Sequence, residues 1–399
     1  MTHQRQAPGS VIGGMLLVAG SCIGAGMLAL PILIGFSGFY PSLTVMVFSW
    51  AFMTFTALLL LEINGWFKKQ VNLVSMAYES LGQKGKIIAW LSYLFLFYSL
   101  LVAYTAASGK IFAAILEAIL GISLPAPFAS IFFTVLFGII VYLGTRAVDQ
   151  FNRALMVGLI ATYLGMIALG VSRIEPNLLA NSAPKYMLIS LPVLVVSFGF
   201  QNMIPSLTAY MKGDLKRVRK SIIGGSLITL AIYLVWSMLV LGVVPFDLIQ
   251  QSYEKGEEAT LPLRHVLGTS GISHFSQGFA FFAVVTSFLA QGLTLTHFLA
   301  DGFKLQPKRS NLWWLSSLAL FPPLALALYN PKIFFRALSF AGGICAMILF
   351  GILPIWMAWL GRYRRKHQSE YHVSGGKLSL IVGLLFSFLV IGCEVAKFF

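Results

Sequence analysis

Eleven apolar runs, each long enough to cross a lipid bilayer as a helix, follow one another along this chain. Hydrophobic residues make up 58% of the 399 residues and charged residues only 10%. A soluble domain carries about 25% charged residues, so the sequence predicts an all-α polytopic membrane protein with eleven transmembrane helices and no soluble domain between them. The predicted spans cover residues 11–36, 40–63, 87–118, 127–144, 150–171, 186–210, 221–244, 275–300, 312–329, 333–360 and 377–398.

The positive charges predict how the chain is oriented. The net charge of +15 is distributed between the apolar runs, as topology signals are, and not in a patch for nucleic acid. Segments on the side of the N-terminus carry 20 of the 28 Lys and Arg residues, and segments on the opposite side carry 7. We therefore expect residues 1–10 to form a cytoplasmic tail and the C-terminus to lie outside. The first run is too long for a cleaved signal peptide.

The centre of the first run is rich in glycine. Gly20, Gly24 and Gly26 lie within it and Pro31 follows, although glycine is a poor helix former. A helix that unwinds in the middle of a membrane frees backbone polar groups, which is tolerated only where protein or a cavity surrounds them. The sequence predicts an interrupted helix beside a binding cavity.

The sixth run has the same character. Pro192, Gly199 and Pro205 interrupt it, and Gln201 and Asn202 place two amides at mid-membrane. Polar side chains at that depth are costly unless they face a cavity or neighbouring helices. The alternative reading is that the glycines allow close helix packing and the prolines only kink the helix.

Runs one and six head two sets of five runs, residues 11–171 and 186–360, with residues 377–398 as an additional eleventh helix. Five spans in each set place the two sets in opposite orientations. A pair of interrupted spans at corresponding positions of two inverted repeats is the best pointer in a sequence to the binding site of a transporter.

The exposed backbone at such breaks predicts the class of ligand. N–H groups at the start of a half-helix favour a carboxylate, and carbonyl groups at the end of one favour an ammonium or a metal cation. A zwitterionic α-amino acid carries both charges. The candidate binding residues are Ser21, Cys22, Ile23, Gly24, Ala25, Gly26, Ser197, Phe198, Gly199, Phe200, Gln201 and Asn202.

Two motifs resemble those of a known family. Gly20-Ser21-Cys22-Ile23-Gly24-Ala25-Gly26-Met27-Leu28-Ala29-Leu30-Pro31 resembles the G-T-x-I-G-A-G-M-L-A-L-P signature of the bacterial hydroxy and aromatic amino acid permeases. Ser197-Phe198-Gly199-Phe200, followed by Ile204-Pro205-Ser206-Leu207, resembles their second signature. The resemblance extends over essentially the whole chain.

The resemblance implies an amino acid–proton symporter of the bacterial inner membrane, with tyrosine as the expected substrate. It also implies the five-plus-five inverted repeat of the leucine-transporter fold, with discontinuous helices one and six. In that fold the third span lies against the substrate, so Tyr104, Gln201 and Asn202 are candidates for recognising its side chain. Many relatives carry a histidine where this chain has Gln201, so coupling or substrate choice differs here if that histidine contributes to either.

Three further residues are candidates for ion coupling. Lys110 lies inside the third span, where we expect it to pair with Glu117 or with a carbonyl of the broken helix. The alternative is a lysine that extends to the membrane surface. In the fold that the chain resembles, a hydroxyl pair such as Thr286 and Ser287 can hold sodium. Such hydroxyls more commonly bond to their own helix.

We expect no cofactor other than the coupling proton or sodium ion. Gly24 to Ala29 formally matches a dinucleotide motif, but no strand precedes it. No pattern for a metal site or a nucleophile is present, so we do not expect an enzyme. The expected partners are an amino acid and the lipid bilayer, while the oligomeric state stays open. The alternative hypotheses are a tryptophan, serine or threonine cargo, sodium coupling, or a membrane receptor that binds an amino acid without moving it.

Overall fold

The computed structural model describes residues 9–67, 71–268, 271–305, 309–367 and 369–398, in which every regular element is helical. Residues 1–8 of the predicted cytoplasmic tail lie outside this range. Ten of the described helices are long and apolar enough to cross a membrane, and a bent pair at the N-terminus makes an eleventh if it is counted as one span. The prediction of a polytopic helical membrane protein is therefore confirmed.

The helices follow the predicted runs closely. The first half of the chain forms α1 (Val11–Cys22), α2 (Ala25–Gly35), α3 (Phe39–Asn64), α4 (Leu73–Leu120), α5 (Ala126–Leu143), α6 (Thr145–Gly170) and the short α7 (Pro176–Leu179). The second half forms α8 (Leu191–Ser197), α9 (Ile204–Tyr210), α10 (Leu215–Val243), α11 (Phe246–Lys255), α12 (Thr260–Leu267), α13 (Gly271–Gly302), α14 (Arg309–Tyr329), α15 (Phe334–Phe340), α16 (Leu353–Tyr363) and α17 (Gly376–Val395). A wider π-helical stretch, η4 (Ala341–Ile352), joins α15 to α16.

The third span begins earlier than predicted. Helix α4 starts at Leu73, not at residue 87, and its direction changes at Gly82, whose φ of 73° lies in the left-handed region. That conformation suits glycine, which has no Cβ to clash with the backbone. The segment before Gly82 escaped prediction because Lys84 and Lys86 interrupt the apolar run just after it.

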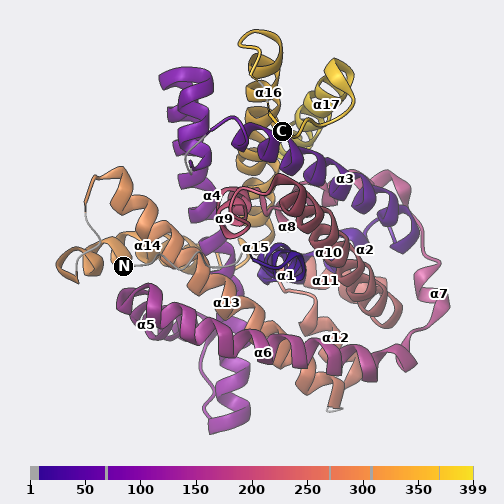
Figure 1. Ribbon diagram of the computed structural model, residues 1–399. Coiled ribbons are helices and arrows are strands. Elements are labelled where there is room, and N and C mark those ends of the chain that lie inside the picture. Colours follow the sequence, from indigo (N-terminus) through magenta and orange to yellow (C-terminus); the bar gives the residue numbers. More distant parts are fainter. Residues whose placement is uncertain (1–8, 68–70, 269–270, 306–308, 368, 399) are drawn as a thin grey trace.

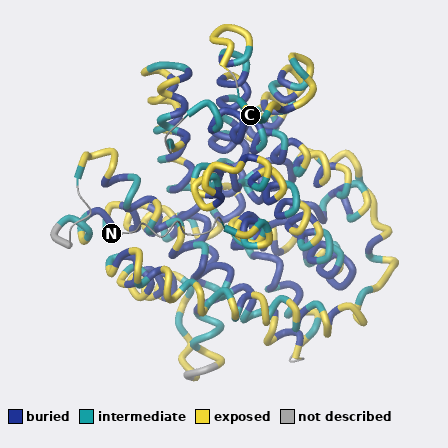
Figure 2. The backbone as a smooth tube through the Cα atoms, in the orientation of Figure 1, coloured by how far each residue is buried: buried dark blue, intermediate teal, exposed yellow. Residues whose placement is uncertain are grey.

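Helices α1 and α2 lie at the centre of the molecule (Figure 1). Helix α10 packs against both of them, while α8 and α13 pack against α2. Figure 2 shows buried backbone in this central region and exposed residues toward the periphery. The peripheral α5, α14 and α17 present large apolar side chains outward, among them Phe128, Phe321 and Leu385, as lipid-facing helices do.

Close packing fixes the position of α8. A Cβ at Gly342 in η4 would lie 1.7 Å from the Pro192 carbonyl oxygen, so only glycine fits at this crossing. Small residues at such crossings allow backbones to approach in membranes. The contact holds η4 beside α8.

A pair of short helices covers the end of α2. The backbone N–H of Ala259, between α11 and α12, donates to the Leu28 carbonyl at 3.0 Å. The ring of Phe36 packs edge-on against Tyr253, with 5.1 Å between the ring centroids. We call residues 246–267 the outer cap, because they lie on the side opposite to the start of α1 along the first span.

A buried ion pair joins distant parts of the chain at the end of the molecule away from the outer cap. Glu62 of α3 accepts from Nε of Arg362 on α16 at 2.8 Å and from the Val373 N–H at 2.8 Å. The side chains of Glu62 and Arg362 are only 1% and 4% exposed. The pair therefore connects α3, α16 and the segment that leads to α17.

Candidate functional site

The helical path of the first span is interrupted at Ile23 and Gly24. Helices α1 and α2 are bent by 61° relative to each other at this point. Gly24 has an extended backbone that any residue adopts, but a Cβ there would lie 2.4 Å from Oγ of Ser287 on α13. The next residue, Ala25, donates its N–H to the same Ser287 oxygen at 2.9 Å. Glycine is needed at position 24 because α13 approaches so closely.

The sixth span is interrupted as well. Helix α8 ends at Ser197 and α9 begins at Ile204, with a single tight turn at Gln201–Met203 between them. Pro205 occupies the first turn of α9, where its missing N–H is not needed. Gly24 precedes the start of α2, and Pro205 lies at the start of α9.

A tyrosine that the sequence did not point to joins the two interruptions. The hydroxyl of Tyr233 on α10 lies 2.7 Å from the carbonyl oxygen of Cys22 and 2.7 Å from that of Ser197. Three residues further on, Nε1 of Trp236 donates to the Met27 carbonyl at 3.0 Å. Helix ends leave carbonyls without intrahelical partners, and the Tyr233 hydroxyl serves two of them. The Met27 carbonyl lacks a partner within α2 because Pro31, four residues later, has no N–H. In the sequence, Tyr233 stands out only as an aromatic residue with a hydroxyl group inside an apolar run.

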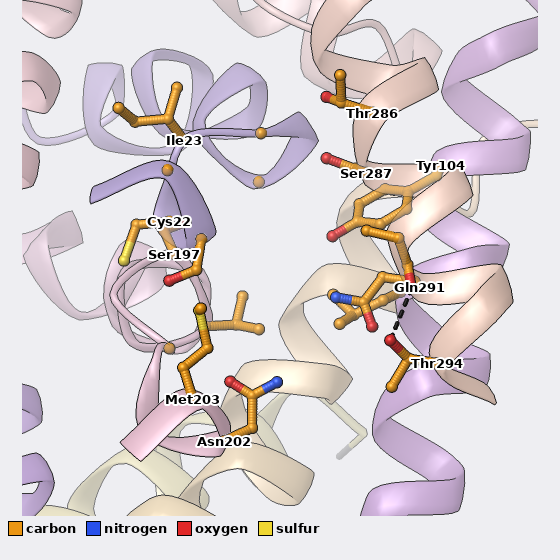
Figure 3. A pocket seen from close by; sticks show the side chains of 18 of the residues that line it. Cys22, Ile23, Tyr104, Ser197, Asn202, Met203, Thr286, Ser287, Gln291 and Thr294 are labelled. Carbon is orange, nitrogen blue, oxygen red and sulfur yellow. Dashed lines mark hydrogen bonds between the residues drawn. The ribbon is translucent and has the colours of Figure 1, made fainter. Parts of the chain in front are cut away.

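A cavity of about 270 Å³ lies between the two interruptions and the neighbouring helices. Its volume is close to the lower limit of about 300 Å³ for small-molecule pockets. Figure 3 shows its wall, with Cys22 and Ser197 on one side and Tyr104, Ser287 and Gln291 on the other.

Most of the predicted binding residues line this cavity. From the prediction these are Ser21, Cys22, Ile23, Gly24, Gly26, Tyr104, Ser197, Gly199, Asn202, Thr286 and Ser287. The wall also contains residues that the sequence did not single out, chiefly Asn152 and Met156 of α6, Gln291 and Thr294 of α13, Met203, and Phe350 of η4. The sequence did not indicate that α6 lines the cavity, because its polar residues are typical of a helix segment at the membrane surface.

The side chain of Gln201 does not face the cavity. It is fully buried against α3, where its amide nitrogen donates to the Met53 carbonyl at 2.9 Å and to Oγ1 of Thr56 at 3.2 Å. The expectation that this amide recognises a substrate side chain is not supported by the geometry. A buried amide needs hydrogen-bond partners, and the Gln201 nitrogen finds them in a neighbouring helix, while its oxygen has none within the described residues.

Three other predicted residues also lie outside the wall. The ring of Phe198 packs on Tyr233, with 5.0 Å between ring centroids, and Phe200 is fully buried. Ala25 contributes to the break through its N–H bond to Ser287. These residues hold the interruptions in place without lining the cavity.

Lys110 has a different partner from the one predicted. Its Nζ lies 3.1 Å from Oε1 of Glu257 and 3.0 Å from the Lys255 carbonyl, both in the outer cap. Neither Glu117 nor a carbonyl of the broken helix bonds to it within the described residues. The sequence placed Glu117 on the same helical face, but the folded cap brings a nearer carboxylate.

The hydroxyl of Thr286 bonds to its own helix, with Oγ1 donating to the Phe282 carbonyl at 2.7 Å. Ser287 instead accepts from Ala25 across the break. Among the described residues, no group of three or more His, Cys, Asp or Glu side chains is placed to hold a metal ion.

The exposed residues of the cavity wall lie toward one side. Ser21, Asn202 and Thr294 line it and are exposed, and all three lie toward the end of the bundle where α1 begins. Beyond the interruptions, Leu28 of α2 and Leu194 of α8 are fully buried. Within the described residues, the wall is therefore exposed toward the start of α1, while the neighbouring parts of α2 and α8 are buried.

Among the described residues that line the cavity, none is an Asp, Glu, Lys, Arg or His. Its polarity comes from hydroxyls, carboxamides and the backbone at the breaks. The N–H of Gly24 has no hydrogen-bond partner within the described residues. Such a site can hold a small molecule with balanced charges.

Comparison with known proteins agrees with a site that holds a small molecule. The profile of the Tryptophan/tyrosine permease family matches residues 8–394. Among curated proteins, the Tyrosine-specific transport systems 1 and 2 of Haemophilus influenzae are 34% and 32% identical to this chain. Each alignment covers 95% of this chain, and 95% and 94% of the respective relative. The Tryptophan-specific transport protein of the same organism is 30% identical, over 98% of this chain and 97% of that protein.

These relatives are transport proteins and not enzymes, and their similarity extends over the whole set of membrane helices. The chain is a multi-pass membrane protein, and it belongs to the Tryptophan/tyrosine permease family.

Proposed function

We propose that this protein is a secondary active transporter that imports an aromatic amino acid, with tyrosine as the main cargo, across the bacterial inner membrane by proton symport. The observation that carries the proposal is the uncharged cavity between two interrupted helices. Two of the most similar relatives are named as tyrosine-specific, which favours tyrosine as the cargo.

The amino acid backbone would bind at the interruptions. The unpaired N–H of Gly24 and the start of α2 favour the substrate carboxylate, and the end of α8 near Ser197 favours the ammonium. The two interrupted spans would belong to five-helix inverted repeats, residues 11–171 and 186–360. The excess of positive charge on the α1 side supports a cytoplasmic N-terminus and a C-terminus outside.

Transport requires that the cavity open alternately to the two sides of the membrane. The cavity is open toward the start of α1, which with a cytoplasmic N-terminus is the inward-facing state. In the proposed cycle, spans one, two, six and seven rock against the rest, and the outer cap leaves α2 when the cavity opens outward.

Tyrosine uptake into proteoliposomes tests this function. With an imposed proton gradient in sodium-free buffer, we expect accumulation of labelled tyrosine that a protonophore abolishes. Excess tryptophan, phenylalanine and serine would rank the competing substrates. Binding of tyrosine without accumulation or counterflow would overturn the transport proposal and favour a receptor.

A sodium-coupled symporter is the second candidate. Thr286 and Ser287 both line the cavity next to the break in the first span, which is the observation that favours it. The hydroxyl proton of Thr286 is used on its own helix, so its oxygen lone pairs remain available for a cation. Uptake that begins only when sodium is added would support this candidate, and Thr286→Val would then raise the sodium concentration needed.

A further inference from the structure

Two of the carboxamides in the cavity wall have a buried oxygen that lacks a hydrogen-bond partner in the described part of the chain. The side-chain oxygens of Asn152 on α6 and Gln291 on α13 are buried, yet neither has a partner within the described residues. Their amide nitrogens make no hydrogen bond to the described protein either. We call these two residues the carboxamide pair. They lie on helices that pack against each other along the cavity.

Several other polar side chains of this wall are already satisfied. Thr286 donates to the Phe282 carbonyl and Thr294 to the Ala290 carbonyl, each at 2.7 Å. Ser287 accepts from Ala25, and Ser21 donates to the Val18 carbonyl at 2.8 Å. Ser197 is also unpaired, but it lies at the interruption, where the charged end of the substrate is proposed to bind.

An unsatisfied buried amide costs about 1–3 kcal/mol, so an apolar side chain would fill the same space more cheaply. A ligand that supplies the missing hydrogen bond recovers this cost. A carboxamide can turn its oxygen or its nitrogen toward the cavity, and no protein partner fixes either orientation in the carboxamide pair. A bound ligand would decide which atom faces it.

The Gln291 amide lies away from the helix ends at which the charged groups of the substrate are proposed to bind. Figure 3 shows the Gln291 amide projecting into the cavity below Tyr104, on the side opposite to Cys22 and Ser197. Apolar side chains line the same cavity and can cover the faces of an aromatic ring, namely Phe97, Leu100, Met156 and Phe350. A substrate held at the breaks by its charged groups would present its side chain to these residues.

We infer that Gln291 and Asn152 recognise a hydrogen-bond donor on the aromatic ring of the substrate. This inference rests on the proposed function and adds a preference to it. A phenol O–H or an indole N–H can donate to a carboxamide oxygen, whereas the ring of phenylalanine cannot. The site should therefore select tyrosine and tryptophan against phenylalanine, because binding phenylalanine leaves the carboxamide pair unsatisfied.

Competition for labelled tyrosine uptake tests the preference without altering the protein. We expect phenylalanine and 4-fluorophenylalanine to compete about tenfold more weakly than tyrosine, the factor for a hydrogen bond worth about 1.4 kcal/mol. The fluorinated analogue is close to tyrosine in size but has no donor. Equal competition by all three compounds would overturn the inference while leaving the transport proposal intact.

The variant Gln291→Met tests the residue, because it keeps the length of the side chain and removes the amide. We expect the tyrosine-to-phenylalanine ratio to fall from about tenfold to within about threefold, with phenylalanine uptake retained. Retained phenylalanine uptake shows that the variant is folded. In the matched control, Thr296→Val on the same helix, the ratio should not change, because that residue does not line the cavity and its hydroxyl bonds to its own helix.

An unchanged ratio in both Gln291→Met and Asn152→Leu would assign the selectivity elsewhere and contradict the inference. If wild-type protein accumulates no aromatic amino acid under any gradient, the proposed function itself fails. The wild-type uptake assay thus separates the two failures. Should Gln291→Met not fold, the analogue series on wild-type protein still decides the question.

Discussion

At the scale of single residues, the hydroxyl of Tyr233 is expected to matter most for how the two interruptions are held. It lies 2.7 Å from two carbonyl oxygens, those of Cys22 and Ser197. The change Tyr233→Phe leaves both carbonyls without this donor in a fully buried place, at a cost of about 1–3 kcal/mol. We expect a lower midpoint of thermal unfolding and slower tyrosine uptake.

Tyr163→Phe is the matched control for this prediction. The Tyr163 hydroxyl donates to one carbonyl, that of Ile232, at 3.0 Å, and its residue is only partly buried. Its loss should cost less stability and leave uptake nearly unchanged. Equal effects of the two variants would mean that Tyr233 has no special role at the interruptions.

At the scale of elements, the approach of α13 to the break in the first span can be tested with a double-mutant cycle. A Cβ at Gly24 would lie 2.4 Å from Oγ of Ser287, so Gly24→Ala should push the two segments apart and reduce uptake strongly. Removing that oxygen with Ser287→Ala should restore part of the activity in the double variant. Residues in contact typically show such non-additivity, at about 0.5–3 kcal/mol.

Gly26→Ala serves as the control, since its Cβ would meet Ser197 Oγ at the longer distance of 3.3 Å. We expect a smaller loss of uptake there, and no rescue of it by Ser287→Ala. Purely additive effects of Gly24→Ala and Ser287→Ala would contradict the steric explanation.

At the scale of the whole molecule, the Glu62–Arg362 pair holds together three distant parts of the chain. Arg362→Met leaves the Glu62 carboxylate buried and without its charged partner, which costs about 3–5 kcal/mol. We expect a large fall in the free energy of unfolding. The exposed pair of Arg153 and Asp149 is the control, and Arg153→Met should change stability by less than about 1 kcal/mol. Similar losses in both would refute the role of burial.

The outer cap should make the stability of the molecule depend on pH. Burial raises the pKa of the Glu258 carboxyl from 4.5 to about 7, although hydrogen bonds from Thr260 oppose the shift. Below pH 4.5 the group is protonated in both folded and unfolded chains. As the pH rises from 4.5 to 7, the unfolded chain loses its proton first, so stability falls and then levels off. The change is at most about 3 kcal/mol.

Thermal unfolding of wild type, Glu258→Gln and Glu254→Gln between pH 5 and pH 8 measures this effect. The wild type should lose more stability across the range than Glu258→Gln, whose amide does not titrate. Glu254 is exposed in the same cap, so Glu254→Gln should follow the wild type. Parallel curves for all three proteins would show that Glu258 does not titrate in this range.

The sequence predicted what depends on neighbours along the chain. Long apolar runs gave the spans, and Gly24 and Pro205 marked where helices stop and restart, because both residues act on the local backbone. It could not predict which side chains meet across helices. Gln201 faces away from the cavity because Met53 and Thr56, far away in sequence, supply its partners. Lys110 pairs with Glu257 for the same reason, and Asn152 and Gln291 became recognisable only when α6 and α13 were seen to share a wall.

The position of Tyr233 has a consequence for motion. Its hydroxyl group is shared by carbonyls at residues 22 and 197, in separate halves of the chain. Pulling α1 away from α8 would strand at least one of these carbonyls in an apolar interior, which opposes any independent displacement. Whatever rearrangement empties the cavity, we expect α1, α8 and α10 to travel as one rigid body, with the deformation at the surfaces where this body meets α4, α6, α13 and η4 and at the outer cap.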